Sequence, residues 1–202
     1  MDAAILAGGR ARRFGGVDKS TLRIGHATIL ERQLDALAGV AGTVFVVAGD
    51  PRPFEGRGLR VVPDRLPDAG ALGGIYTALV EAQSPSVLVV ACDLPFLTTG
   101  LLAELAGLAD DAYDAVLPRS LDGRQPLCAV YARRLAGTVL RRIESGHLKI
   151  QELLGAIRLR ELGPDELARF DPDGRLFHNV NTPGDLELAL RFAATATRNA
   201  GC

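Results

Sequence analysis

The chain has little of what marks secreted, membrane-bound or metal-cluster proteins. Three cysteines stand among 202 residues, and their spacing suits neither a metal site nor an even set of disulfides. We therefore expect a reduced, cytoplasmic setting. No apolar run approaches the length of a membrane span, and no basic segment precedes an apolar stretch at the N-terminus. We expect no membrane association and no signal peptide.

Tryptophan is absent, and neither sign of charge is in clear excess. The formal net charge is −1, which provides no overall field for a nucleic acid, so we expect no nucleic-acid partner. Apolar residues make up 48% of the chain, as in a globular protein, and the length suffices for one full core. We expect a single domain over residues 1–194, a frayed tail over 195–202, and a monomer or weak homo-oligomer.

Short apolar runs alternate with helical patterns along the chain. The runs at 43–47 and 87–91 are continuous, which is typical of strands covered on both faces. This alternation predicts an α/β fold, Rossmann-like, with three α/β/α layers and a mostly parallel central sheet. Near the end we expect a strand that finishes at about Val180 and a helix from Pro183 to Phe192, with Thr182 as its N-cap. Ligands of such sheets lie at the carboxyl ends of the strands, where functional residues are expected.

A glycine-rich basic stretch follows the first apolar run. It reads LAGGRARRFGGVDKST over residues 6–21 and combines four glycines with three arginines and Lys19. Glycines let backbone N–H groups converge on one point, and basic side chains add charge, so the stretch predicts a polyphosphate-binding loop. It is neither a Walker A loop, because Lys19 follows an aspartate, nor a dinucleotide fingerprint, because Gly8 and Gly9 are adjacent.

Two carboxylates follow predicted strands, and a pair of asparagines precedes the last predicted helix. Asp93 comes directly after the most apolar strand, where it could bind Mg²⁺, which usually takes one or two carboxylates plus substrate phosphates. The alternative for Asp93 is a helix cap. Asp64 stands at the exit of a shorter strand. Asn179 and Asn181 flank Val180, so on a strand their amides would face a ligand or a metal-bound water together.

Five motifs in the same order resemble the molybdenum cofactor guanylyltransferase family of nucleotidyltransferases. They are LAGG with the later Arg13 and Asp18-Lys19, the segment 63–74 with PD and ALGG, CDLPF at 92–96, QPLCAVY at 125–131, and NVNTP at 179–183. Ala71 departs from the usual proline of the second motif. The resemblance implies transfer of GMP from GTP to the terminal phosphate of molybdenum-molybdopterin, with release of pyrophosphate and with Mg²⁺ as cofactor.

The resemblance also implies roles for individual residues. Catalysis is expected from Arg13, Lys19 and Asp93, with Asp93 as the metal ligand and Asn179 and Asn181 at the acceptor. The nucleotide-binding set is expected to be Leu6, Ala7, Gly8, Gly9, Lys19, Asp64, Gly73 and Asp93. Three alternatives remain open: a cytidylyltransferase for the same cofactor, a sugar-phosphate nucleotidyltransferase, and a nucleotide sensor without catalytic activity.

Overall fold

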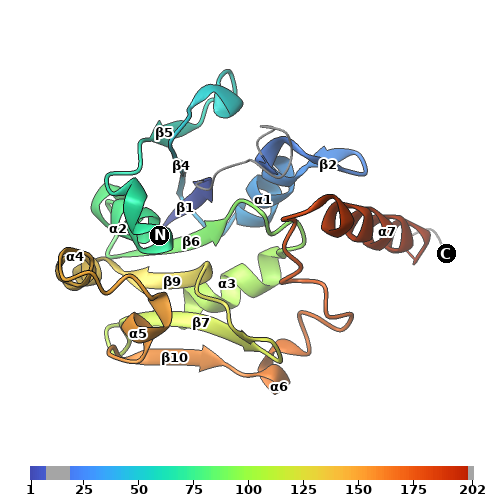
Figure 1. Ribbon diagram of the computed structural model, residues 1–202. Coiled ribbons are helices and arrows are strands. Elements are labelled where there is room, and N and C mark those ends of the chain that lie inside the picture. Colours follow the sequence, from blue (N-terminus) through green and yellow to red (C-terminus); the bar gives the residue numbers. More distant parts are fainter. Residues whose placement is uncertain (8–18, 200–202) are drawn as a thin grey trace.

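A twisted sheet runs through the centre of the molecule in the computed structural model, which describes residues 1–7 and 19–199 (Figure 1). Its strand order is β10-β7-β9-β6-β1-β4-β5, and β9 is antiparallel to both of its neighbours. The other main strands run in one direction, as predicted. Their bounds are β1 Asp2–Ala7, β4 Thr43–Ala48, β5 Arg60–Val62, β6 Ser86–Ala91, β7 Ala115–Ser120, β9 Cys128–Ala132 and β10 Leu159–Leu162.

The direction of β9 follows from the short connection that precedes it. Residues 121–127 join β7 to β9 and include only the two-residue strand β8 (Gly123–Arg124), which pairs with the end of β7. A parallel crossover needs roughly a dozen residues or more, so this connection leaves only an antiparallel return. The β7–β8 hairpin therefore lies at the same edge of the sheet as the carboxyl ends of the parallel strands.

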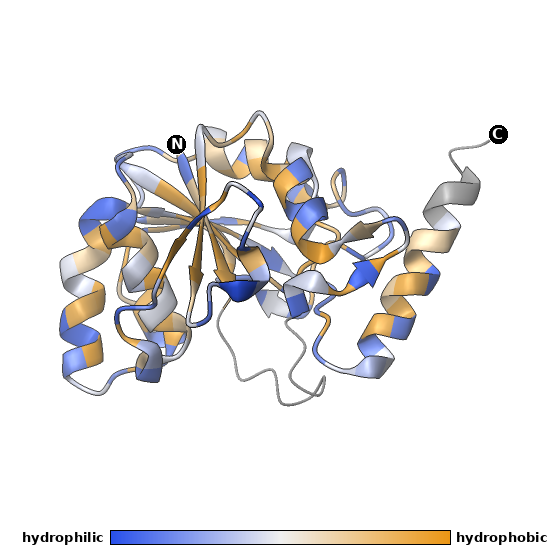
Figure 2. Ribbon diagram, turned by 90° about the horizontal axis from the view of Figure 1, so that it is seen from above, coloured by the Kyte–Doolittle hydropathy of each residue, from blue (hydrophilic) through white to orange (hydrophobic). Residues whose placement is uncertain are grey.

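Helices cover both faces because successive strand residues point to opposite sides. In β6, Leu88 and Val90 pack with α1 (Ile29–Leu37), α3 (Thr99–Gly107) and α6 (Pro164–Leu167). Val87 and Val89 pack with α2 (Ala71–Glu81), α4 (Ala136–Glu144) and α5 (Ile150–Leu154). Figure 2 shows the apolar strands between these two helical layers. The predicted three-layer arrangement is confirmed.

The last helix packs in a small apolar cluster of its own at one side of the sheet. α7 (Pro183–Asn199) contacts the hairpin of β2 (Arg23–Ile24) and β3 (Ala27–Thr28), as Figure 1 shows. Their apolar contacts centre on four buried residues, Ile24, Ile29, Val180 and Ala189. This packing ties the segment after the glycine-rich stretch to the C-terminal helix.

Two predictions for the C-terminal region are wrong. Residues 178–181 form no strand, because Val180 donates its N–H to a loop carbonyl instead of to a neighbouring strand. The last helix does not end near Phe192 but continues to Asn199, so the expected frayed tail from residue 195 is helical as far as Asn199. The run 193–198 keeps three alanines, which favour helix. Within residues 1–7 and 19–199, no helix is both long and apolar enough to cross a bilayer.

Candidate active site

Three polar side chains from distant parts of the chain meet at the carboxyl edge of the sheet. Asp93 follows β6, Lys19 opens a 3₁₀ turn (Lys19–Thr21) after β1, and Asn181 precedes α7. The Lys19 ammonium donates a hydrogen bond to Oδ1 of Asn181, and its Nζ lies 3.8 Å from Oδ2 of Asp93. The side chains of Lys19 and Asp93 keep 23% and 19% of their surface exposed, so both can reach a ligand. The structure thus brings together one predicted residue from each of three motifs.

The backbone around Asn181 is fixed by the start of α7 and by the Asp93 loop. The N–H of Val180 donates to the Asp93 carbonyl over 2.9 Å. Oδ2 of Asp185 accepts the N–H groups of Asn181 and Thr182, at 2.9 and 2.8 Å, and Oγ1 of Thr182 accepts the N–H of Asp185. This reciprocal pattern is a capping box, which confirms Thr182 as the helix cap. Asn181 is consequently held beside Lys19 without being part of a strand.

Opposing influences act on the ionisation of Asp93. Burial raises the pKa of its carboxyl group, whereas the Lys19 charge and a side-chain hydrogen bond with Asn181 lower it, and the net pKa is above the usual value. The helix-cap alternative is excluded, because Thr98 caps α3 by accepting the N–H of Leu101. Asp93 therefore does not cap α3, and its carboxylate is available to a ligand in the site.

The described part of the site offers one carboxylate, which is enough for a metal ion whose other ligands come from a substrate. Among the described residues, no group of three His, Cys, Asp or Glu side chains could hold a metal ion. Asp93 offers one carboxylate, and Mg²⁺ commonly takes one or two together with substrate phosphates and water. The donor set fits a divalent ion that arrives with a phosphorylated ligand.

Asp64 organises the loop that leads from β5 to α2. Its Oδ1 accepts hydrogen bonds from the Leu66 N–H and the Thr77 hydroxyl, each with a donor–acceptor distance of 3.0 Å. Thr77 is fully buried and also accepts the N–H of Arg65 over 2.9 Å. Sequence reasoning missed Thr77, which is an unremarkable position in a helical pattern. These contacts seat the loop on α2 and leave Asp64 half-buried at the strand exit.

Gly73 has a steric reason to be glycine. A Cβ atom at this position would lie 2.0 Å from the carbonyl oxygen of Leu66, far inside van der Waals contact. Gly70, just before the helix, has a φ of +58°, which L-residues with a side chain rarely adopt. The glycines of this motif therefore allow close packing of the loop on α2, and through it the placement of Asp64.

The end of β1 lies directly beside the Asp93 loop. The carbonyl of Leu6 accepts the N–H of Cys92 over 3.0 Å, and Ala7 is in register with Ala48 of β4. Gly8, Gly9 and Arg13 lie outside the described residues. Asn179 is exposed, and the predicted shared face of Asn179 and Asn181 loses its basis because the segment is not a strand.

Comparison with known proteins agrees with this arrangement. A family model described as the MobA-like NTP transferase domain matches residues 3–161. The chain belongs to this family. A relative from Desulfosudis oleivorans, named molybdenum cofactor guanylyltransferase, is 34% identical over 94% of this chain and 95% of its own length. The family resemblance drawn from the five motifs is thus confirmed.

Solved structures confirm the MobA-like fold. Molybdopterin-guanine dinucleotide biosynthesis protein A from Archaeoglobus fulgidus superposes with a TM-score of 0.80 at 28% identity, covering 96% of this chain and all of that one (100%). A Mycobacterium tuberculosis protein solved in complex with manganese shares the fold, with a TM-score of 0.65 at 17% identity over 94% of this chain and 97% of its own.

One buried residue of this MobA-like site escaped the sequence analysis. Gln33 of α1 is 1% exposed, and its Nε2 donates to the carbonyls of Ala91 and Leu94, at 2.6 and 3.1 Å. The available signal was a glutamine next to the apolar face of a helix that carries Leu30, Leu34 and Leu37. Such a residue is usually read as the solvent side of the helix.

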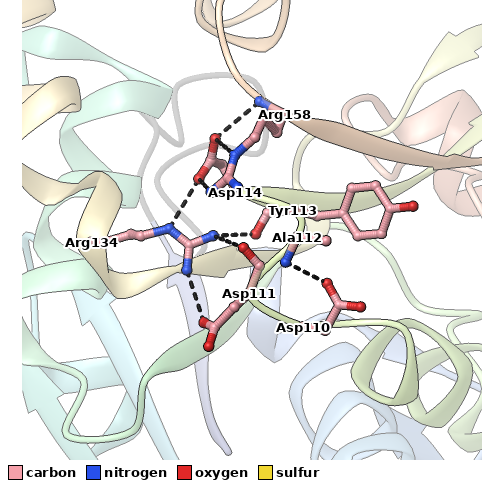
Figure 3. Close-up of polar contacts among 7 residues, drawn as sticks. All are labelled: Asp110, Asp111, Ala112, Tyr113, Asp114, Arg134 and Arg158. Carbon is pink, nitrogen blue, oxygen red and sulfur yellow. Dashed lines mark hydrogen bonds and ion pairs between the residues drawn. The ribbon is translucent and has the colours of Figure 1, made fainter.

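A second group of charges lies at the opposite edge of the MobA-like sheet, beside a cavity of about 310 Å³ at the amino ends of β6 and β7. Asp114 is its centre: it accepts hydrogen bonds from Arg134 and from both the backbone and the guanidinium of Arg158 (Figure 3). Arg134 also contacts Asp111 and the Tyr113 carbonyl. These ion pairs connect the start of β7 to the residue segments that follow β9 and precede β10. They also lower the pKa of Asp114. The group is a structural clamp, remote from the strand ends where Lys19 and Asp93 meet.

Proposed function

We propose that this protein transfers GMP from GTP to the terminal phosphate of molybdenum-molybdopterin, producing molybdopterin guanine dinucleotide and pyrophosphate. The observation that carries the proposal is the meeting of Lys19, Asp93 and Asn181 at the carboxyl edge of a MobA-like domain. The name of the Desulfosudis oleivorans relative supports guanylyl transfer over the alternatives. The presence of Lys19 and Asp93 together speaks against a nucleotide sensor without catalytic activity.

Mg²⁺ is the proposed cofactor, with Asp93 as its protein ligand. Bound together with the nucleotide, it would neutralise negative charge on the triphosphate. Support comes from the single carboxylate of Asp93 at the strand end and from the manganese complex of the structural neighbour. Burial raises the pKa of Asp93, and a buried carboxylate gains most from an added positive charge.

The chain contributes position and charge to the reaction. A terminal phosphate oxygen of the acceptor forms a bond to the α-phosphorus of GTP, and the bond from that phosphorus to the bridging oxygen breaks, so that pyrophosphate leaves. Lys19, oriented by Asn181, stabilises the charge that spreads over the phosphate oxygens. The glycine-rich backbone at Gly8 and Gly9 and the side chain of Arg13 are proposed to hold the same triphosphate.

The pocket for guanine must provide hydrogen-bond acceptors, because the N1–H and N2–H₂ groups of the base are hydrogen-bond donors. The Leu6 carbonyl already accepts the Cys92 N–H, so the loop from Asp64 to Gly73 is the better candidate. Hydrogen bonds of Thr77 with Asp64 and with the Arg65 N–H hold this loop against α2. Asn179, exposed beside Asn181, is proposed to contact the molybdopterin acceptor.

The test is a pyrophosphate-release assay with molybdopterin as acceptor and with GTP, CTP or ATP as donor. We expect release with GTP, because the wrong base would leave buried acceptors unpaired at about 1–3 kcal/mol each. Equal rates with CTP would instead favour a cytidylyltransferase. Tight GTP binding without any pyrophosphate release would favour the sensor.

A further inference from the structure

A single buried side-chain amide donates hydrogen bonds to both ends of the turn that carries Asp93. Nε2 of Gln33 donates to the Ala91 carbonyl over 2.6 Å and to the Leu94 carbonyl over 3.1 Å. These two carbonyls flank the dipeptide Cys92-Asp93. Gln33 lies on α1, beneath the sheet edge, and is 1% exposed, so it cannot itself reach a nucleotide. Its contacts act on the backbone of the turn, whereas Lys19 and Asn181 act on the Asp93 carboxylate.

Gln33 is a buried polar side chain whose hydrogen-bonding capacity is only half used. Both neighbours of Nε2 are carbonyl oxygens, so the amide nitrogen must face them, and Oε1 is left buried with no partner among the described residues. A buried acceptor without a partner is costly. A leucine or methionine would avoid that cost but would leave the Ala91 and Leu94 carbonyls without the donor that Gln33 supplies. What only a two-donor amide supplies here is a link between the two ends of the turn.

The rest of the turn is held at separate points. The Cys92 N–H donates to the Leu6 carbonyl, and the Asp93 carbonyl accepts the Val180 N–H. Between Ala91 and Leu94 themselves, the direct hydrogen bond is long, with the Leu94 nitrogen 3.4 Å from the Ala91 oxygen. Gln33 thus reinforces the weakest closure of the turn.

We propose that Gln33 is a positioning residue of the metal site: it fixes the Ala91–Leu94 turn so that the Asp93 carboxylate is preorganised for the divalent ion that accompanies the nucleotide. The inference rests on the proposed role of Asp93 as metal ligand. If this role is correct, a change at Gln33 weakens metal binding only when Asp93 is present. A purely structural role in the core would not produce this dependence on Asp93.

The test measures Mn²⁺ binding to the full chain in the presence of GTP, by the electron paramagnetic resonance signal of free Mn²⁺. The same titration without protein is subtracted, because GTP itself binds Mn²⁺. Gln33→Met removes both donors and keeps the length of the side chain, and Gln33→Leu, which is also apolar, is the second variant if the methionine variant does not fold. The matched control is Leu30→Met, a fully buried position on the same helix that faces the core. Thermal melting and circular dichroism establish that each protein is folded.

We expect Gln33→Met to weaken Mn²⁺ binding about three- to tenfold, because losing the two hydrogen bonds loosens the turn that presents the Asp93 carboxylate. Leu30→Met should bind as the wild type does. In an Asp93→Asn background, Gln33→Met should cause no further loss, because the two changes share one route. A Gln33 variant that is folded and titrates like the wild type overturns the inference, as does an equal additional loss in the Asp93→Asn background. If Asp93→Asn alone titrates like the wild type, the proposed metal site itself has failed, and the inference with it.

Discussion

Nζ of Lys19 lies 3.8 Å from Oδ2 of Asp93 and donates to Oδ1 of Asn181, although the three residues belong to the two ends and the middle of the chain. Each reaches this point by a different device: Asp93 by the end of a buried strand, Lys19 by a 3₁₀ turn, and Asn181 by the capped start of α7. A side-chain cluster assembled from three elements in this way is sensitive to the loss of any one member.

Lys19→Ala is expected to lower turnover by roughly 10²–10³-fold, as for removal of one preorganised donor to a developing charge. The melting temperature should change little, because the lysine contributes almost nothing to the core. The control is Lys149→Ala, whose side chain is 83% exposed and pairs only with Glu152 among the described ion pairs. Initial rates of pyrophosphate release check the prediction, and wild-type turnover in Lys19→Ala would remove Lys19 from the mechanism.

Gly73→Ala is expected to destabilise the protein by about 1–3 kcal/mol, because the added Cβ collides with the Leu66 carbonyl at 2.0 Å and the loop must shift. The same shift moves Asp64, so GTP affinity should fall as well. Gly107→Ala is the matched control: a Cβ there meets nothing within 4 Å, and alanine favours the helix. Urea denaturation and GTP titration of both variants decide the matter, and a neutral Gly73→Ala would refute the steric account.

Asp114→Asn is expected to destabilise the fold by about 1–2 kcal/mol at pH 7 without affecting activity, because Asp114 lies at the edge opposite the site. Arg158 and Arg134 hold the Asp114 pKa below the ordinary value of 3.8, so the native state binds this proton more weakly than the unfolded chain does. The stabilisation is therefore present above about pH 4 and is lost as the pH falls below it.

The pH dependence of that effect supplies its own test. The difference in unfolding free energy between wild type and Asp114→Asn should shrink steadily from pH 5 to pH 2. Asp111→Asn is the control, because the Asp111 carboxylate is fully exposed and its pairing with Arg134 is screened by water. A difference that stays constant with pH would show that the Asp114 charge is not what stabilises the clamp.

The sequence predicted the sheet and the position of Asp93 because both depend on local patterns. The apolar runs at 43–47 and 87–91 are typical of strands covered on both faces, and a carboxylate directly after such a strand lies at the edge of the sheet. The capping residue Thr182 followed from Thr-Pro at a helix start.

What the sequence did not predict depends on contacts between distant residues. Val180 alternates with asparagines as a strand residue would, but its N–H pairs with the carbonyl of Asp93, which no local pattern reveals. Gln33 and Thr77 look like ordinary helix residues until the loops that they hold are placed beside them. The steric demand at Gly73 likewise appears only when the Leu66 carbonyl is in position.

The central claim is that Asp93 binds the metal that accompanies the nucleotide, and Asp93→Asn tests it most directly. Burial raises the pKa of Asp93, which means that its charge costs folding stability as the pH rises above the unfolded value of about 3.8. An uncharged asparagine of the same shape should therefore melt at or above the wild-type temperature near pH 7.

The measurement is the initial rate of pyrophosphate release against Mg²⁺ concentration for wild type and Asp93→Asn, with melting curves alongside. We predict that the variant is at least as stable as the wild type, loses most of its turnover, and regains part of it at high Mg²⁺, because weaker binding is offset by concentration. Superimposable rate curves for the two proteins would contradict the account, and the metal site would have to be sought at another strand end.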